Sequence, residues 1–333
     1  MKMVEPRLEV ARASAPAKVI LFGEHFVVYG EPAIVIAVDK RAYAEATLRN
    51  DNQIYINSIN LSVSGFFKGK HFQPEKNDKT AVSKLVPIKN SAEQVLKKTN
   101  KSIGVNIKIQ SDIPASAGLG SSAAVAAATA AAVGHLVGIK LPKEDVFNIA
   151  LNAERIVHGT PSGIDPAIST YGGTILFQKS KGFTPLDVKI NIPLVVGNTN
   201  LERSTGDLVA AVKLRRDNYP SIIDPIIKTG GEIALRAVDA LKKGNLKVLG
   251  ELLSINHALL SAVGVSTEAL DRLIYAARNT GAYGAKLTGG GGGGCMIALT
   301  NESRIKKVIN AIDLAGGAAF EARKTDEGVR VES

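Results

Sequence analysis

The stretch PASAGLGSSAAVAAA, residues 114–128, decides how the rest of this chain is interpreted. An alternating apolar and polar segment over residues 103–110 predicts a half-buried strand before it, and a helix of small residues is expected from Ser121. The turn between them would present free backbone N–H groups and the positive end of a helix dipole to an anion. Gly118 and Gly120 would let an anion approach the backbone closely. The stretch is neither a Walker A loop nor a dinucleotide fingerprint, and alone it is equally typical of a serine-capped helix.

A second glycine-rich segment is KLTGGGGGGC, residues 286–295, which lies between two predicted strands. Glycine loses more conformational freedom on folding than any other residue, so six in a row are unfavourable in a compact unit. The run therefore indicates a place where another group approaches the backbone, rather than a flexible linker.

The segment APAKVILFGEHFVVYG, residues 15–30, places charged side chains at the two ends of a predicted strand. Lys18 begins the strand, and Glu24 and His25 follow Gly23 at its end. Catalytic groups gather in loops after strands, although a single lysine or a Glu-His pair is more often surface decoration.

The segment LNAERIVHGTPSGIDPAIST, residues 151–170, carries two acids. On a helical wheel of residues 146–158, Glu154 falls inside the apolar arc that includes Ile156 and Val157, and a buried carboxylate needs a cation, a metal or a donor. Asp165 is expected in a Gly/Pro/Ser loop after that helix. A structural ion pair is one interpretation of Glu154. A catalytic pair is favoured, because phosphoryl transfer to an alcohol uses one carboxylate for Mg²⁺ and another near the hydroxyl.

Composition limits the class of protein. The 333 residues are 45% apolar, and a single cysteine, Cys295, excludes an internal disulfide framework and favours a reducing compartment. No apolar stretch is long enough for a bilayer and the first residues lack a signal-peptide core, so a cytoplasmic protein without a membrane partner is expected. The net charge of +10 comes from scattered lysines and arginines without a nucleic-acid-binding signature, so no nucleic-acid partner is expected.

The order of predicted elements indicates an α+β protein with a strand-rich first half and a helix-rich second half. We place the division near residues 181–182, which gives domains 1–182 and 183–333. The polar segment 69–80 is predicted to be a mobile loop. Strands are predicted at 18–22, 33–39, 43–48, 54–57, 103–110, 175–177, 188–196, 282–287, 295–299 and 318–323. Helices are predicted at 91–98, 121–137, 142–158, 206–218, 224–243, 246–263, 267–280 and 303–314.

Together and in this order, the four segments resemble the GHMP kinases, a family that phosphorylates small alcohols with ATP. The resemblance implies an N-terminal domain like ribosomal protein S5 domain 2 and a ferredoxin-like C-terminal domain. HGTPSGIDPAISTYGG (158–173) and NTNLERSTGDLVAAV (198–212) are most similar to the members that act on mevalonate. The implied activity is therefore ATP-dependent phosphorylation of the C5 hydroxyl of (R)-mevalonate to 5-phosphomevalonate, on the route to isoprenoids. One departure is Gly290, where many members have alanine.

The resemblance also implies roles for individual residues. Asp165 would be the carboxylate beside the acceptor hydroxyl and would act as a base or as a positioner. Lys18 would hold Asp165 ionised and would neutralise charge in the transition state. Ser122 and Glu154 would hold Mg²⁺, and Glu24, His25 and Thr205 would bind the acceptor together with Lys18 and Asp165. The phosphates of ATP would lie against Ser111, Pro114, Ala115, Ser116, Ala117, Gly118, Leu119, Gly120, Ser121 and Ser122. The site would be completed from the C-terminal domain by Gly289, Gly290, Gly291 and Gly292.

Two alternatives remain open from the sequence. A sister kinase for phosphomevalonate would need additional cations near the acceptor, and Arg203 is the one obvious basic residue in the segment 198–212. A non-catalytic sensor with this fold is less favoured, because Lys18, Ser122, Glu154 and Asp165 are all present. Family members are often dimers, which leaves a homodimer as an expectation from the resemblance alone.

Overall fold

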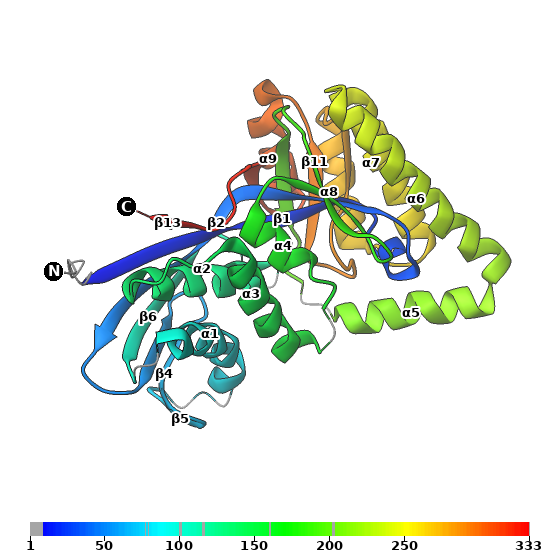
Figure 1. Ribbon diagram of the computed structural model, residues 1–333. Coiled ribbons are helices and arrows are strands. Elements are labelled where there is room, and N and C mark those ends of the chain that lie inside the picture. Colours follow the sequence, from blue (N-terminus) through cyan, green and yellow to red (C-terminus); the bar gives the residue numbers. More distant parts are fainter. Residues whose placement is uncertain are drawn as a thin grey trace.

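The computed structural model describes residues 9–76, 78, 80–99, 102–114, 117–159, 161–201 and 204–332. Two sheets organise this part of the chain. In Figure 1 the long strands of the larger sheet run across the molecule toward the helices of the second half.

The larger sheet is built on a long antiparallel pair, β1 (Val10–Phe22) and β2 (Ala33–Arg49). Its strand order in the described residues is β13-β1-β2-β6-β3-β4-β5, and β7 pairs with the other half of β2 and with β8. Its remaining strands are β3 (Ile54–Ser58), β4 (Val63–Lys68), β5 (His71–Pro74), β6 (Gly104–Ser111), β7 (Thr174–Gln178), β8 (Gly182–Leu186) and β13 (Arg330–Glu332).

Helices α1 (Ala81–Leu96), α2 (Ser121–Leu136) and α4 (Ile164–Tyr171) pack onto this sheet, and α3 (Lys143–His158) packs against these three helices. The central helix is α2, whose alanines are buried almost all round. Small side chains let a helix approach a sheet closely, so its first turn can reach the middle of β1.

The smaller sheet contains β9 (Pro193–Asn198), β10 (Gly284–Leu287), β11 (Cys295–Leu299) and β12 (Ala318–Arg323), all antiparallel, in the order β10-β11-β9-β12. Helices α8 (Glu268–Asn279) and α9 (Ile305–Leu314) pack against it. This order gives the β-α-β-β-α-β arrangement of a ferredoxin-like unit, which confirms the predicted fold class for this half.

Helices α5 (Thr205–Asn218), α6 (Pro220–Lys242) and α7 (Leu246–Ala262) fill the connection between β9 and α8 (Figure 1). The side chains of Ser204, Asn245 and Thr267 accept backbone N–H groups at the starts of α5, α7 and α8. Such caps satisfy donors that a helix start leaves free, which explains why these helices begin where they do.

The chain returns to the larger sheet at its end, because β13 pairs antiparallel with β1. The N and C labels therefore lie close together in Figure 1. Arg41, which is 5% exposed, fixes this return by donating to Ser14 Oγ at 2.6 Å and to the Gly328 carbonyl at 2.6 Å. Since β8 and β13 extend the larger sheet past residue 182, the division into domains 1–182 and 183–333 stays a prediction.

Four local expectations were wrong. The segment 69–80 contains β5, so it is not simply a loop, and the helix expected from residue 91 begins at Ala81 with Pro87 inside it. Asp165 lies in the first turn of α4, not in a loop. Ile156 and Val157 are 46% and 48% exposed, so the buried arc of α3 ends before them.

None of the helices in the described ranges combines the length and apolar character that crossing a membrane requires.

Candidate active site

The centre of the candidate site is an ion pair between two segments distant in sequence. Lys18 Nζ lies 2.9 Å from Asp165 Oδ1. The lysine side chain is 8% exposed and the aspartate side chain 25%, so the pair is partly shielded but reachable by a small molecule. Strand β1 supplies the lysine and the first turn of α4 the aspartate. The opposite charges of the ammonium and the carboxylate hold the two side chains against each other.

The glycine turn before α2 lies directly against this pair. The Lys18 N–H donates to the Leu119 carbonyl at 2.9 Å, which joins the turn to β1. Gly118 and Gly120 have φ angles of 72° and 74°, a backbone region that glycine adopts without strain. A Cβ on Gly120 would lie 2.8 Å from Lys18 Cγ and 3.4 Å from Asp165 Oδ2. The turn therefore approaches the ion pair as closely as a residue without a side chain allows.

Glu154 of α3 is the second acid of the site and is only 6% exposed. Burial raises its pKa to about 8, and the negative charge of Asp165 adds to this effect while Lys18 opposes it. No hydrogen bond or ion pair reaches its carboxyl group from the residues that the structure describes. Its partner is therefore not a lysine or arginine in that part of the chain, contrary to the structural interpretation of Glu154.

Glu24 and His25 face the smaller sheet. Glu24 forms an ion pair with Lys286 of β10, and both side chains are fully buried. Burial raises the pKa of Glu24 and lowers that of Lys286, and in each case the partner's charge opposes the shift. The Nε2–H of His25 donates to the Gly290 carbonyl at 2.8 Å, since a carbonyl can only accept. These two contacts fasten the end of β1 to the glycine run.

The glycine run is a tight turn between β10 and β11. Four of its residues, Gly289, Gly291, Gly292 and Gly294, have φ angles between 65° and 79°. Gly290 lies under Thr205, the first residue of α5, because a Cβ there would be 2.9 Å from Thr205 Oγ1. The exposed Thr205 thus lies next to the same glycine whose carbonyl His25 contacts.

The remaining predicted residues are placed as follows. Ser121 and Ser122 begin α2, and Ser122 is exposed. Pro114 precedes the turn and Ala117 is buried within it. Ser111 ends β6, where its Oγ accepts the Ile113 N–H at 3.1 Å and its N–H donates to Asn60, so its known contacts do not join it to the turn. Ala115, Ser116 and Arg203 lie outside the described residues.

The acids and hydroxyls present fit a magnesium ion that arrives with a nucleotide. No group of three acids, histidines or cysteines suited to a metal occurs among the residues that the structure covers. Mg²⁺ bound to a nucleotide keeps waters and phosphate oxygens and needs only one or two carboxylates. Glu154 is such a carboxylate, buried and without a protein partner in the described part of the chain.

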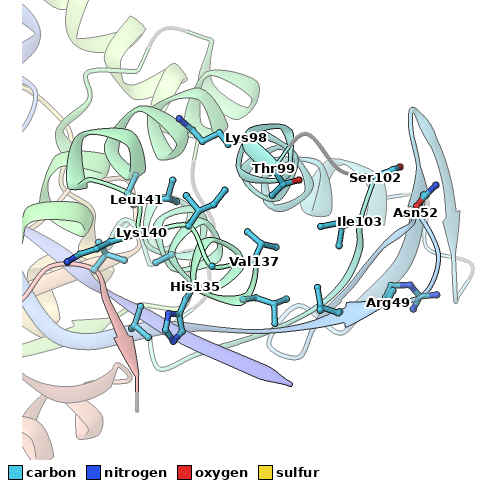
Figure 2. A pocket seen from close by; sticks show the side chains of 18 of the residues that line it. Arg49, Asn52, Lys98, Thr99, Ser102, Ile103, His135, Val137, Lys140 and Leu141 are labelled. Atoms are coloured by element: carbon cyan, nitrogen blue, oxygen red, sulfur yellow. The ribbon is translucent and has the colours of Figure 1, made fainter. Parts of the chain in front are cut away.

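A cavity of about 1110 Å³ lies elsewhere, between the C-terminal end of α2, the end of α1 and the turn after β2 (Figure 2). None of the predicted site residues lines it. Its wall passes through Thr99 and Ser102, and the two residues between them are not described. The geometry that points to chemistry is therefore the Lys18–Asp165 pair and not this cavity.

Comparison with known proteins decides the family. The model of the GHMP kinases N-terminal domain matches residues 87–173, and that of the GHMP kinases C-terminal domain matches residues 237–318. The chain is 42% identical over 328 residues to the mevalonate kinase of Pyrococcus horikoshii, covering 96% of this chain and 97% of that one. The chain belongs to the GHMP kinase family.

Other GHMP kinases are similar along the whole chain. The mevalonate kinase of Archaeoglobus fulgidus is 36% identical over 321 residues, which cover 96% of this chain and 99% of that protein. The crystal structure of the Methanococcus jannaschii mevalonate kinase superposes with a TM-score of 0.81 at 28% identity and covers 96% and 100% of the two chains. The L. major mevalonate kinase in complex with R-mevalonate gives 0.81 at 26% identity over 95% and 96%. The two-domain GHMP kinase fold is thereby confirmed.

One charged residue of this GHMP kinase was missed, although it begins the quoted glycine segment. Lys286 lies in the middle of the buried strand β10, where a lysine is unusual. That position was visible in the sequence and could have marked it as a residue with a buried partner. Which partner it has depends on the packing of the two sheets.

Proposed function

We propose that this GHMP kinase transfers the γ-phosphoryl group of ATP to the C5 hydroxyl of (R)-mevalonate, giving ADP and 5-phosphomevalonate. The observation that carries the proposal is the Lys18–Asp165 pair, held against the glycine turn. Use of ATP follows from the kinase family, and mevalonate is what the similar proteins named above are described as phosphorylating or binding.

The acceptor hydroxyl would lie beside Asp165, which accepts its hydrogen bond and takes its proton as the oxygen bonds to phosphorus. Lys18 keeps Asp165 ionised and neutralises part of the charge on the transferring group. The transition state of phosphoryl transfer is loose, so positioning and electrostatic stabilisation contribute more than strong base catalysis. The ion pair supplies both, because each member fixes the other's position.

The ATP phosphates would lie along the turn that ends at Ser122, where N–H groups at the start of α2 point outward. Glu154 and Ser122 would hold the Mg²⁺, which would neutralise negative charge on the phosphates of ATP. Glu24, His25 and Thr205 would hold the rest of the acceptor. These assignments rest on the family resemblance and on the burial of Glu154 without a described partner.

The experiment measures ADP release from Mg-ATP with mevalonate, phosphomevalonate, homoserine or galactose as the acceptor. Mevalonate alone is expected to stimulate it. Asp165→Asn is expected to abolish most turnover with ATP binding intact, whereas Asp145→Asn, which breaks an exposed pair on α3, should behave like wild type. Stimulation by another acceptor only, or near-normal turnover of Asp165→Asn, would contradict the proposal.

Three finer expectations stay predictions. A cytoplasmic location rests on the single cysteine. The expectation of a homodimer rests on the family resemblance, because family members are often dimers. The absence of a nucleic-acid partner rests on the scattered distribution of basic residues.

A further inference from the structure

The ion pair between Glu24 and Lys286 is the most deeply buried charge pair that the structure describes. Both side chains are 0% exposed, and Lys286 also donates to the Leu287 carbonyl at 2.6 Å. Glu24 follows β1 of the larger sheet and Lys286 belongs to β10 of the smaller one. Removing two charges from water is unfavourable, and an apolar pair of similar volume often stabilises a protein at least as well. Stability alone is thus a weak reason for this pair.

Only half of the Glu24 carboxylate is satisfied. Oε1 receives the Lys286 ammonium, whereas Oε2 is buried without a hydrogen-bond partner in the described part of the chain. Buried acceptors are nearly always paired in folded proteins, so an unpaired carboxylate oxygen calls for a donor from outside the chain. A carboxylate only accepts hydrogen bonds, so the matching ligand group is a hydroxyl or another N–H or O–H donor.

Contacts of the neighbouring residues connect Glu24 with the candidate active site. The positive charge of Lys18 acts on Glu24, so the two lie within electrostatic range. The neighbouring residue His25 donates to Gly290, the glycine under Thr205. Thr288 Oγ1 adds a third link between the sheets by donating to the Ile20 carbonyl at 2.9 Å. Glu24 thus lies between the reacting pair and the glycine run.

We propose that Lys286 is a positioning residue for the acceptor: it holds Glu24 as an oriented carboxylate whose Oε2 accepts a hydrogen bond from an acceptor hydroxyl other than the one that reacts. The inference rests on the proposed function, which places the reacting hydroxyl at Asp165. It also predicts specificity for the acceptor, because the Glu24 carboxylate favours an acceptor with a hydroxyl at this position and repels one with a carboxylate or phosphate there.

Other charges near the pair do not replace Lys286. Lys18 faces Glu24 from β1 but is already paired with Asp165. His257 of α7 feels the charge of Lys286, and its pKa is lowered to about 4, mainly by burial, so it is neutral near pH 7. On α8, Arg278 donates to the Ala285 carbonyl and Asp271 accepts from His257. Without Lys286, the carboxyl group of Glu24 would therefore become much harder to ionise.

The test compares wild type with Lys286→Met, using purified full-length protein and mevalonate as the acceptor. Losing a charged hydrogen bond to the substrate should raise KM for mevalonate about 10–100-fold. KM for ATP should stay within about twofold, because the nucleotide lies on the other side of the Lys18–Asp165 pair. Lys306→Met on α9, exposed in the structure, is the matched control and should leave both constants unchanged.

A pH series distinguishes positioning from a purely structural role. In Lys286→Met the pKa of Glu24 rises further, because the cation that opposed the effect of burial is gone, so a higher pH favours the carboxylate. The deficit in kcat/KM for mevalonate should therefore shrink between pH 6 and pH 9. A deficit that is constant over this range would overturn the inference, as would an unchanged KM for mevalonate.

A double variant protects the test against misfolding. Glu24→Gln combined with Lys286→Met removes both charges, so it should fold even if Lys286→Met does not, and should show the raised KM without the pH dependence. Failure of both variants to fold would make the pair structural and overturn the inference. If the wild type does not phosphorylate mevalonate, the proposed function is wrong. If the wild type is active and the variants have a normal KM for mevalonate, only the inference about Lys286 is wrong.

Discussion

At the scale of single residues, the candidate site contains ionisable groups that are largely buried, so the charge of each group affects the pKa of another. Lys18 pairs with Asp165, and both act on Glu154. With Glu154 protonated at neutral pH, the three groups carry no net charge together. The nucleotide-free site is therefore electrically balanced, and binding Mg-ATP would convert Glu154 to the carboxylate that a metal needs.

Lys18→Met keeps the aliphatic stem and removes the ammonium. We expect kcat to fall on the order of 10²–10³-fold, with a smaller change in KM for mevalonate, because the charge acts mainly in the transition state. Steady-state kinetics checks this, with Lys228→Met, an exposed lysine of α6, as control. If KM alone changes, Lys18 is a binding residue and its proposed catalytic role is wrong.

Glu154→Gln tests the unusual state of the second acid. The pKa of Glu154 is near 8 in the folded protein against 4.5 ordinarily, so the folded state binds the extra proton. Protonated Glu154 therefore contributes fully to the free energy of unfolding below about pH 4.5, and this contribution is lost as pH rises toward 8. At the alkaline end the free energy of unfolding of the wild type is lower by roughly 2–4 kcal/mol. A glutamine at this position does not titrate, so it adds no pH dependence to the free energy of unfolding. Denaturant unfolding should therefore show the variant equal to wild type at pH 5 and more stable at pH 8.

The same substitution gives a second observable. Mg-ATP binding to wild type at pH 7 should release close to one proton from Glu154, and binding to Glu154→Gln should release none from this position. Calorimetry in buffers of different ionisation enthalpy measures the difference. A loss of roughly 3–5 kcal/mol in the nucleotide-free variant would instead indicate a broken structural pair.

At the scale of elements, two glycine turns shape the site for different reasons. Gly120 sits against Lys18 and Asp165, whereas Gly290 lies beneath Thr205 and accepts from His25 through its carbonyl. Gly291 combines a φ of 73° with a position where a Cβ would be 2.1 Å from the Val265 carbonyl oxygen. Gly290 has no positive φ, and the three atoms nearest to a Cβ there all belong to the side chain of Thr205.

Gly290→Ala and Gly291→Ala form a matched pair of variants. Gly290→Ala should fold with nearly unchanged stability, because the exposed Thr205 can move aside, and should alter KM for mevalonate if Thr205 contacts it. Gly291→Ala should lose at least about 2 kcal/mol from left-handed strain and a backbone clash. Thermal unfolding and acceptor kinetics check both. Equal stability of the two variants would refute this description of the turn.

The elements also show what the sequence could and could not predict. Helices α5, α7 and α8 were expected within a few residues, because each begins with a capping side chain, and α7 and α8 also have an apolar face. The eight-residue α4 was missed, since Pro166 and the neighbouring glycines look like a loop. Strand β13 was missed because its three residues are too few to show a strand pattern in the sequence. They form a strand by pairing with β1. The pairing of Glu24 with Lys286 depends on contacts between residues 262 apart.

At the scale of the whole molecule, the two sheets are joined at the end of β1 and again by the returning C-terminal segment. The first joint carries Glu24, His25 and the glycine run. The second is organised by Arg41, which donates to the Ser14 carbonyl at 3.1 Å as well as to Gly328. The site lies at the first joint, so its geometry depends on both sheets being in place.

Arg41→Met tests the second joint. Removing the guanidinium orphans the buried Ser14 and Gly328 carbonyls and should lower the free energy of unfolding by roughly 2–4 kcal/mol. Arg12→Met, on the same sheet, breaks an exposed pair with Glu45 and should change it by less than about 1 kcal/mol. Urea unfolding compares the two, and similar losses would show that Arg41 does not fasten the C-terminal segment.

The pairing of β13 with β1 also sets the timing of folding during synthesis. Strand β1 meets this neighbour roughly 300 residues after it has itself been synthesised, which at about 5–20 residues per second is a delay of some 15–60 s. Throughout that interval one edge of β1 has no partner from β13, and an unpaired edge can join a strand of another nascent chain. Slower translation prolongs this exposure, so the yield of native enzyme should depend on elongation speed and on chaperones that shield the open edge.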